Sequence, residues 1–383
     1  MTETDIDVSF VFPCLNEEKT MELCVNELLD VIKNMKAKCE IIISDNGSTD
    51  NSLNIAKKLP VRVVNTPQKG YGSALRNGFE HAKGKYIAFA DIDGSYPLKF
   101  LPQMYEAALK EDADMVIASR MTGEIEKNAM PWLHRHIGTP ILTMLINLFF
   151  KGKLTDCNSG FRLMKKTAYE SWNTTSDGME FASELLIKAL KNKAKMVEIP
   201  AGLRVDKRSK VPHLNTWKDG MRHLLFILSE CPRLFENIGF ILLVLFSLIF
   251  GVARIFSPLK IGNITFLNYH TQIVCIIFAT LGMQLYMYSS MLYVLRPKEK
   301  PRKVLATLLD IKEDRLLFLI FAIFLLVGYG VIKLFYTWIK TDFQELNMLY
   351  DMLLYVYLVS VLSSGAIGLL GAHIVKKVLK KNC

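Results

Sequence analysis

Two carboxylates stand one residue apart at Asp91 and Asp93, directly after the apolar run Tyr86–Ala90. Such a run predicts a buried parallel strand. Side chains at positions i and i+2 point to the same side of an extended backbone, and α/β folds bind ligands at the carboxyl ends of parallel strands. The pair could therefore hold a hard cation and the diphosphate that the cation neutralises, although two such acids alone also fit an ordinary solvated turn.

Further strands are expected to position this pair. They alternate with amphipathic helices at the spacing of βαβ units, which predicts a parallel, doubly wound sheet. The expected strands are Ile6–Phe12, Glu40–Ser44, Val61–Val64 and Met115–Ser119.

Polar loops follow the first two of these strands, at residues 13–18 and 45–50. The carboxyl ends of parallel strands share one edge, so these loops should meet Asp91 and Asp93 there. Each loop also has a structural interpretation, with Asn16 capping the next helix and Asp45 bracing a turn.

A glycine-bearing segment begins at Lys69 and Gly70 and leads into a predicted helix. Glycine lets backbone N–H groups approach an anion closely, and Lys69 adds positive charge. The segment therefore supports a phosphate-binding function.

The second part of the chain is dominated by four apolar runs, each long enough to cross a bilayer. These runs are Ile238–Phe256, Ile273–Leu295, Leu316–Ile339 and Met352–Val375. Lys and Arg concentrate in the middle connector and the C-terminal tail, which predicts a multi-pass protein with its N-terminal domain in the cytoplasm. We expect a membrane location, most simply the bacterial inner membrane, although the same topology would suit an ER membrane.

The net charge of +10 is explained largely by this topology and by attraction to anionic lipid, and it gives little support to nucleic-acid binding. The seven cysteines are scattered and form no CxxC pair, which predicts a reduced compartment without zinc. The acidic N-terminus leads straight into a strand, so no cleaved signal peptide is expected.

Seven short motifs occur in order within roughly residues 5–225. They are Phe12–Glu18, Ser44–Asp50, Lys69–Ala74, Asp91–Asp93, Ala118–Arg120, Asp156–Arg162 and Arg208–Lys210. Together they resemble family 2 glycosyltransferases with the GT-A fold, especially dolichol-phosphate mannose synthases and bacterial polyprenyl-phosphate glycosyltransferases.

The resemblance implies an α/β GT-A catalytic domain, Rossmann-like with a mainly parallel sheet, followed by an all-α domain of four transmembrane helices. It implies Mg²⁺ or Mn²⁺ held by Asp91 and Asp93. The mannose synthases use a glutamine at the position of Ser95, so the third protein ligand stays open. The residues expected to bind the nucleotide sugar are Pro13, Asn16, Glu17, Asp45, Lys69, Gly70 and Asp91.

The expected reaction is attack by a lipid phosphate on the anomeric carbon of a UDP- or GDP-linked sugar, with inversion. A phosphate monoester has a second pKa of about 6 and is mostly dianionic near neutral pH, so no strong general base is required. Asp93, Asp156 and Arg120 are the expected catalytic residues, with Asp156 orienting the acceptor or taking its proton. The acceptor phosphate is expected to contact Arg120, Arg135, Arg208 and Lys210.

Two segments are expected beside the membrane. Residues 214–228 have the spacing of an amphipathic helix that could lie in the interface, and residues 137–150 could be a second such helix or a buried one. The predicted domains are residues 1–210 for catalysis, 211–235 for the juxtamembrane helix and 236–383 for the membrane domain.

We therefore expect a polyprenyl-phosphate sugar synthase of cell-envelope glycan biosynthesis, acting on undecaprenyl or dolichyl phosphate. The alternatives are transfer to a glycerolipid, a processive polysaccharide synthase and a non-catalytic platform that binds sugar nucleotides. The processive alternative is disfavoured because no Arg-Trp pair occurs in the sequence. Four crossings could guide the lipid or mediate homo-oligomerisation.

Overall fold

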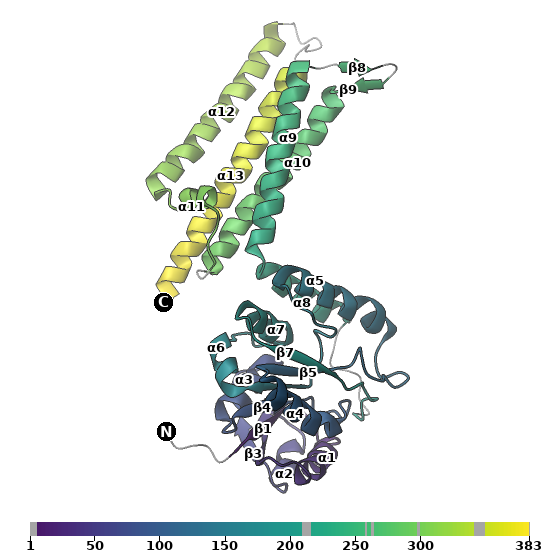
Figure 1. The fold of residues 1–383 in the computed structure, drawn as a ribbon. Helices are drawn as coiled ribbons and strands as arrows, with labels where there is room; N and C mark the ends of the chain where they lie inside the picture. The colour runs from purple at the N-terminus through teal and green to yellow at the C-terminus, as the bar shows by residue number, and fades with distance from the viewer. Residues whose placement is uncertain are drawn as a thin grey trace. The chain divides into compact units, whose positions relative to one another are not determined.

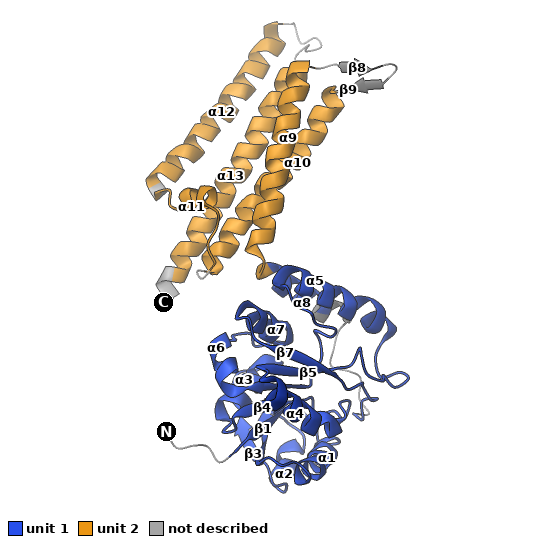
Figure 2. Ribbon diagram, in the orientation of Figure 1, with its two compact units in different colours: residues 1–228 blue, residues 229–383 orange. Residues whose placement is uncertain are grey.

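A computed structural model describes residues 6–208, 216–256, 259–261, 264–296, 299–340 and 349–382. The chain divides into two compact units, residues 1–228 and 229–383 (Figure 2). The domain boundaries predicted at residues 210 and 235 remain a prediction. Within the first unit, the C-terminal helix is α8, Thr216–Ser229.

The first unit contains a mostly parallel sheet of seven strands in the order β3-β2-β1-β4-β6-β5-β7 (Figure 1). The strands are β1 Val8–Cys14, β2 Cys39–Asp45, β3 Arg62–Asn65, β4 Tyr86–Phe89, β5 Met115–Ser119, β6 Arg162–Lys165 and β7 Met196–Pro200. The five predicted strands are confirmed within a few residues. The sequence prediction missed β6, which runs antiparallel between β4 and β5, and β7 beside β5.

Both faces of the sheet are covered by helices. Along β1, Phe10 and Phe12 face one hydrophobic core, whereas Val11 faces the other. This alternation explains why the strands are apolar throughout rather than at every second residue. The helices of this unit are α1 Met21–Lys33, α2 Ser52–Ala56, α3 Tyr71–His81, α4 Leu101–Glu111, α5 Thr139–Phe150, α6 Lys166–Trp172, α7 Phe181–Lys191 and α8, with the short turns η1 Leu98–Phe100 and η2 His134–Gly138.

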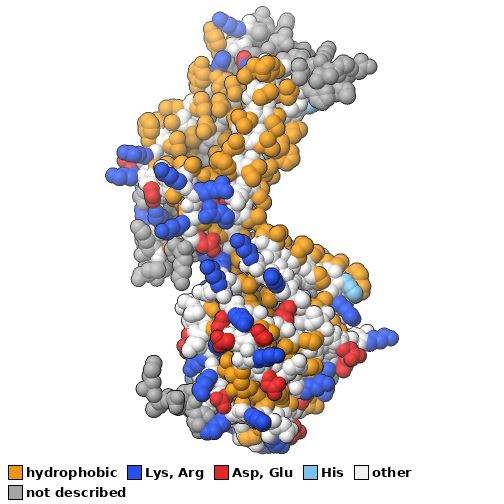
Figure 3. Space-filling model, in the orientation of Figure 1, with side chains coloured by type: hydrophobic (Ala, Val, Ile, Leu, Met, Phe, Trp, Pro, Cys, Tyr) orange, Lys and Arg blue, Asp and Glu red, His pale blue; other side chains and the backbone are white. Residues whose placement is uncertain are grey.

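The second unit is a bundle of apolar helices. Four of them are long and apolar enough to cross a membrane, as the sequence predicted. On the face seen in Figure 3, hydrophobic side chains predominate on this unit, and most of its Lys and Arg side chains gather near one end. Its elements are α9 Pro232–Phe256, α10 Tyr269–Leu295, α11 Lys303–Leu309, α12 Glu313–Lys340 and α13 Leu349–Asn382, with a small hairpin of β8 Leu259–Ile261 and β9 Ile264–Phe266.

Candidate active site

The loops after β1 and β2 lie side by side at the carboxyl edge of the sheet. Cys14 pairs with Asp45 at the ends of the two strands. The backbone N–H of Asn16 donates to Ser48 Oγ at 3.0 Å, and Asn16 Oδ1 accepts from the backbone N–H of Thr49 at 2.7 Å. The predicted capping of α1 by Asn16 is therefore wrong. Asn16 has a left-handed backbone conformation (φ 59°), and its side chain binds the neighbouring loop instead.

Asp45 is 2 % exposed and braces the second loop by accepting from the backbone N–H groups of Gly47 and Ser48 at 3.0 and 3.2 Å. The loop that begins at Lys69 lies against it. Lys69 Nζ donates to the carbonyl of Asn46 at 2.8 Å, and the backbone N–H of Gly70 donates to Asn46 Oδ1 at 2.7 Å. Polar groups that were expected to bind the donor are thus clustered, with Asn46 joining two of the loops.

The Asp91–Asp93 pair follows β4 at the same edge. Tyr71 donates its hydroxyl to Asp91 Oδ1 at 2.9 Å. Asp93 is 6 % exposed, and its Oδ1 accepts from the backbone N–H and hydroxyl of Ser95 at 2.9 and 2.6 Å. Ser95 therefore orients Asp93. Burial, followed by the charge of Asp93, raises the pKa of Asp91 to about 7.

Arg208 joins the loops after β1 and β4. Its guanidinium donates to Glu17 Oε1 at 2.9 Å, to Asp93 Oδ2 at 2.8 Å and to Asp206 Oδ2 at 2.9 Å. Burial raises the pKa of Glu17 to about 6, although Arg208 opposes this shift. These three carboxylates engage the Arg208 side chain at the carboxyl edge of the sheet, and its expected contact with the acceptor phosphate stays a prediction.

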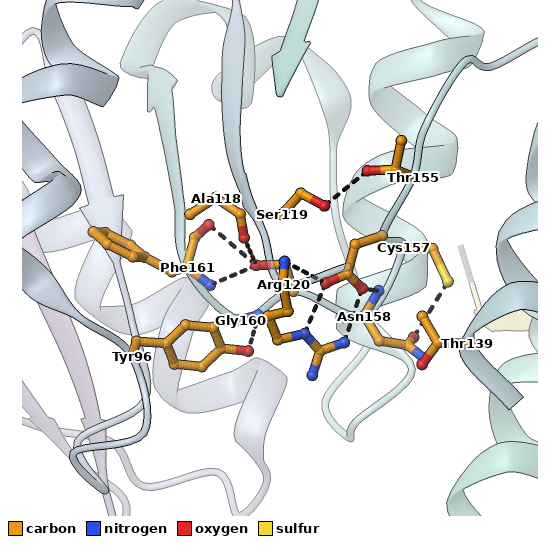
Figure 4. A network of polar contacts seen from close by, with 12 residues as sticks. Tyr96, Ala118, Ser119, Arg120, Thr139, Thr155, Cys157, Asn158, Gly160 and Phe161 are labelled. Carbon is orange, nitrogen blue, oxygen red and sulfur yellow. Dashed lines mark hydrogen bonds and ion pairs between the residues drawn. The ribbon is translucent and has the colours of Figure 1, made fainter. Parts of the chain in front are cut away.

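Arg120 and Asp156 form a second buried pair (Figure 4). Arg120 Nε and Nη2 donate to the two Asp156 oxygens at 2.7 and 2.8 Å, and the backbone N–H of Arg120 adds a third bond at 3.1 Å. Burial alone would raise the pKa of Asp156, but the charge and hydrogen bonds of Arg120 lower it more strongly, so that its pKa lies below the ordinary value. Asp156 is fully buried, so it positions Arg120, and the predicted proton-accepting function of Asp156 does not fit this geometry.

A cavity of about 360 Å³ lies next to Arg120. Tyr71, Asp91, Tyr96, Asn158 and Gly160 form polar parts of its wall. Its apolar wall comes from the segment before α5, from α5 itself, from the loop before α7 and from α8. The apolar lining residues are Met130, Leu133, Ile137, Ile141, Leu142, Met179, Ala182, Met221 and Leu224, and the remaining lining residues are His134, Gly138, Thr139, Gly220 and His223.

Arg135 and Lys210 were also expected to contact the acceptor phosphate. Arg135 lies in η2, is exposed and does not line the cavity. Lys210 falls outside the residues that the structure describes. Of the four residues expected at the acceptor phosphate, Arg120 alone lines the cavity in the part of the chain that is described.

The carboxylate pair fits a divalent cation that arrives with a diphosphate. No group of three or more His, Cys, Asp or Glu side chains that could hold a metal occurs within the described residues. Mg²⁺ commonly uses one or two protein carboxylates together with substrate phosphates and water, so a two-carboxylate site is sufficient. Burial and mutual repulsion, which raise the pKa of Asp91 to about 7, indicate a site that needs added positive charge.

Several residues of the site were not singled out from the sequence. Tyr71 lies between two glycines, and Gly160 follows Asn158 and Ser159 in a predicted motif, so both had a visible signal. A Cβ at Gly160 would lie 2.8 Å from Asp91 Oδ2, which explains the glycine. Asp177, in the loop before α7, pairs with Arg76 of α3.

Glu184 lies in the first turn of α7. It is 1 % exposed and accepts from the backbone N–H groups of Thr175 and Ser176. It therefore orders the loop before α7 and is not part of the cavity wall.

A mostly parallel sheet with an acidic carboxyl edge defines the first unit as a GT-A-type domain. Residues 9–172 match the model of the family described as glycosyl transferase family 2, and the chain carries a domain of this family.

Two curated relatives each match about half of the chain. The hexosyltransferase Agl6 of low-salt glycan biosynthesis from Haloferax volcanii is 37% identical over 182 residues, 48% of this chain and 44% of the relative. Dolichol-phosphate mannosyltransferase from Pyrococcus furiosus is 28% identical over 194 residues, 49% of this chain and 54% of the relative. The chain thus spans about half the length of these relatives.

Solved structures share the fold. Glucosyl-3-phosphoglycerate synthase from Mycobacterium tuberculosis, in complex with Mn²⁺, UDP and phosphoglyceric acid, has a TM-score of 0.50 and 21% identity. The similarity covers 60% of this chain and 80% of that one. At this level of identity the similarity establishes the GT-A fold alone.

Proposed function

We propose that this protein transfers a sugar from a nucleotide sugar to the phosphate of a membrane polyprenyl phosphate, with inversion at the anomeric carbon. The observation that carries the proposal is the cavity with Asp91 and Arg120 in its polar wall. Most of the remaining wall is apolar and comes from α5, α8 and the segments before α5 and α7. A phosphate joined to a long isoprenoid has the same division between a charged head and an apolar chain.

The donor would bind at the carboxyl edge of β1, β2 and β4. Glu17, Asp45 and the Asn46 loop are buried polar groups suited to a ribose and base, and Lys69 and Gly70 lie beside them. Asp91 and Asp93 would hold Mg²⁺ or Mn²⁺. When bound, the cation would neutralise the diphosphate of the donor. The relative with dolichol-phosphate mannosyltransferase activity and the structural neighbour with UDP and Mn²⁺ support this assignment.

The acceptor phosphate would meet Arg120, which Asp156 holds in a fixed orientation through two hydrogen bonds. A fixed guanidinium can bind a phosphate while leaving one of its oxygens to attack. Asp91 is the sole carboxylate among the lining residues described, and it is assigned to the donor. This favours a dianionic phosphate acceptor, which needs no general base, over the hydroxyl of a glycerolipid.

The helices around the cavity support a position at the bilayer surface. Trp132, Leu148 and Leu225 are 67%, 68% and 59% exposed, and they lie before η2, on α5 and on α8. Apolar side chains this exposed are explained if α5 and α8 lie in the membrane interface. We propose that this surface contacts the cytoplasmic leaflet, in accordance with the distribution of Lys and Arg between the apolar runs.

The test uses the full chain in lipid nanodiscs with a panel of UDP- and GDP-sugars, undecaprenyl or dolichyl phosphate, and Mg²⁺ or Mn²⁺. We expect one donor to give a lipid-linked sugar, and chelation or Asp93→Asn to abolish it. The same yield with polyprenol in place of its phosphate would contradict the proposal, as would nucleotide-sugar binding without turnover for every donor.

A further inference from the structure

Arg162 is the largest fully buried side chain described in the protein, with no exposed surface. It lies at the start of β6. Its three nitrogens donate to main-chain carbonyls: Nε to Ser159 at 2.9 Å, Nη1 to Ala182 at 2.9 Å and Nη2 to Cys157 at 3.0 Å. Arg162 forms no ion pair with a described residue.

Arg162 differs from the other two arginines at the site in how its charge is neutralised. Arg120 is neutralised by Asp156, and Arg208 is shared by three carboxylates. Burial lowers the pKa of Arg162 below its ordinary value. At Arg208 burial also lowers the pKa, but the neighbouring carboxylates more than offset this, so that the pKa is raised overall. Arg162 is the arginine in this part of the site whose positive charge is not balanced by a carboxylate bonded to it.

The three carbonyls locate this charge directly behind the cavity. Cys157 and Ser159, whose carbonyls Arg162 binds, are the chain neighbours of the lining residues Asn158 and Gly160. Ala182, whose carbonyl it also binds, lines the cavity itself. The charge of Arg162 interacts with Tyr71 and Tyr96, which also line the cavity, and with Asp156, whose hydrogen-bonded partner is Arg120. The guanidinium therefore lies against main chain that belongs to the cavity wall or adjoins it.

A buried guanidinium without a carboxylate costs free energy that an apolar residue of similar size would not. Carbonyl dipoles offset part of this cost but leave the net charge in place. An anion in the cavity would interact with that charge through a medium of low polarity, where the interaction is stronger than in water.

We propose that Arg162 is a positioning residue whose unneutralised charge draws the anionic head of the acceptor into the cavity from behind its wall. Arg162 need not touch the acceptor: it supplies electrostatic potential, whereas Arg120 supplies direct hydrogen bonds. This inference rests on the proposed phosphate acceptor.

The test compares a charged and a neutral ligand that share one isoprenoid chain. Farnesyl phosphate and farnesol are titrated onto the full chain in one detergent, and binding is measured by microscale thermophoresis. Arg162→Gln keeps hydrogen-bond donors and removes the charge, Arg162→Lys keeps the charge, and Arg162→Met removes both. Arg62→Met is the matched control, because Arg62 pairs with Glu40 and does not line the cavity.

We expect Arg162→Gln and Arg162→Met to weaken farnesyl phosphate binding at least tenfold. One unit of ligand charge acting over ~10 Å at an effective dielectric constant of about 20 gives roughly this factor, and the dianion carries more than one. Farnesol binding should be unchanged, Arg162→Lys should restore most of the phosphate affinity, and Arg62→Met should bind both ligands like the parent.

Equal losses for phosphate and alcohol, or no rescue by lysine, would show that Arg162 acts only by shaping the loop, and this result would overturn the inference. Unaltered phosphate binding in a folded Arg162→Gln variant would overturn it as well. If the parent chain binds no farnesyl phosphate, the acceptor assignment fails and the inference fails with it. The case in which the parent binds and Arg162→Gln binds equally contradicts the inference alone.

Discussion

Replacement of Arg208 by alanine tests whether the donor-side carboxylates need a cation. In the structure the guanidinium reaches Glu17, Asp93 and Asp206 at 2.8–2.9 Å. The Arg208 side chain is 20% exposed, and those of Glu17 and Asp93 are 7% and 9% exposed. The substitution therefore leaves two mostly buried carboxylates without their counter-charge.

The size of the effect follows from this geometry. Each contact has a gross Coulomb energy of about 4 kcal/mol at an effective dielectric constant of about 20, but desolvation cancels much of it. Removing one partner of a buried pair typically costs about 3–5 kcal/mol, and partial exposure places Arg208→Ala near the lower limit, at about 3 kcal/mol. For a domain of this size we expect a decrease in Tm of about 6–12 °C.

The assay is thermal unfolding of the full chain in detergent, followed with a thiol-reactive dye. Cys14, Cys24 and Cys157 are buried in the first unit and become reactive as it unfolds. We expect millimolar Mg²⁺ or Mn²⁺ with UDP or GDP to restore most of the lost Tm, because the cation replaces the missing charge. Arg204→Ala is the matched control. Arg204 is close to Arg208 in the sequence, but it pairs with Glu27, which is outside the carboxylate cluster.

Two results would refute this reasoning. An Arg208→Ala protein with the Tm of the parent in the presence of a chelator would show that the carboxylates do not need a counter-charge. Equal stabilisation of the parent, Arg208→Ala and Arg204→Ala by the cation would show that the cation does not act at these carboxylates.

Three further predictions concern the cavity, the buried ion pair and the membrane surface. Gly160→Ala should lower kcat/KM at least tenfold with little change in Tm, because its Cβ would lie 2.8 Å from Asp91 Oδ2. Gly251→Ala is the control and should behave like the parent, because its Cβ meets nothing within 4 Å and Gly251 does not line the cavity; equal activities of Gly160→Ala and the parent would contradict the prediction. Asp156→Asn should cost about 3–5 kcal/mol at neutral pH by denaturant unfolding. Burial raises and the ion pair lowers the pKa of Asp156, with a net decrease, so its stabilising contribution is present above the ordinary value of 3.8 and lost as the pH falls below it; an unchanged acid transition in Asp156→Asn would argue against this pair. Trp132, 67% exposed, should be quenched by brominated lipid when it is the sole tryptophan left in the chain, and emission typical of water would refute its contact with the bilayer.

The sequence predicted the parts of the fold that have a strong local signal. Apolar runs identify β1, β2, β4 and β5 because these strands are buried on both faces. In contrast, β6 has four residues with a charged residue at each end. Arg162 can be buried there because three carbonyls receive its N–H groups, two from the preceding loop and one from α7. Such tertiary compensation has no periodicity that a sequence pattern could reveal.

The candidate site was predictable to the same extent. Asp91, Asp93 and Glu17 follow strands, so topology alone brings them to one edge. The partners of these side chains were not predictable: Arg208 is 115 residues from Asp93 and pairs with it through the fold. The same holds for Arg120 and Asp156, which had been assigned separate chemical roles and form one buried pair.

The most direct test of the central claim is to follow the oxygen atoms of the acceptor. The full chain, with the donor that it uses, receives a polyprenyl phosphate whose non-bridging phosphate oxygens are all ¹⁸O, and the lipid product is analysed by mass spectrometry. Attack by the phosphate on the anomeric carbon predicts a product with a single phosphorus atom that retains every ¹⁸O label and carries the sugar in inverted configuration. A product with two phosphorus atoms, or sugar transfer to polyprenol at the same rate, would contradict the account.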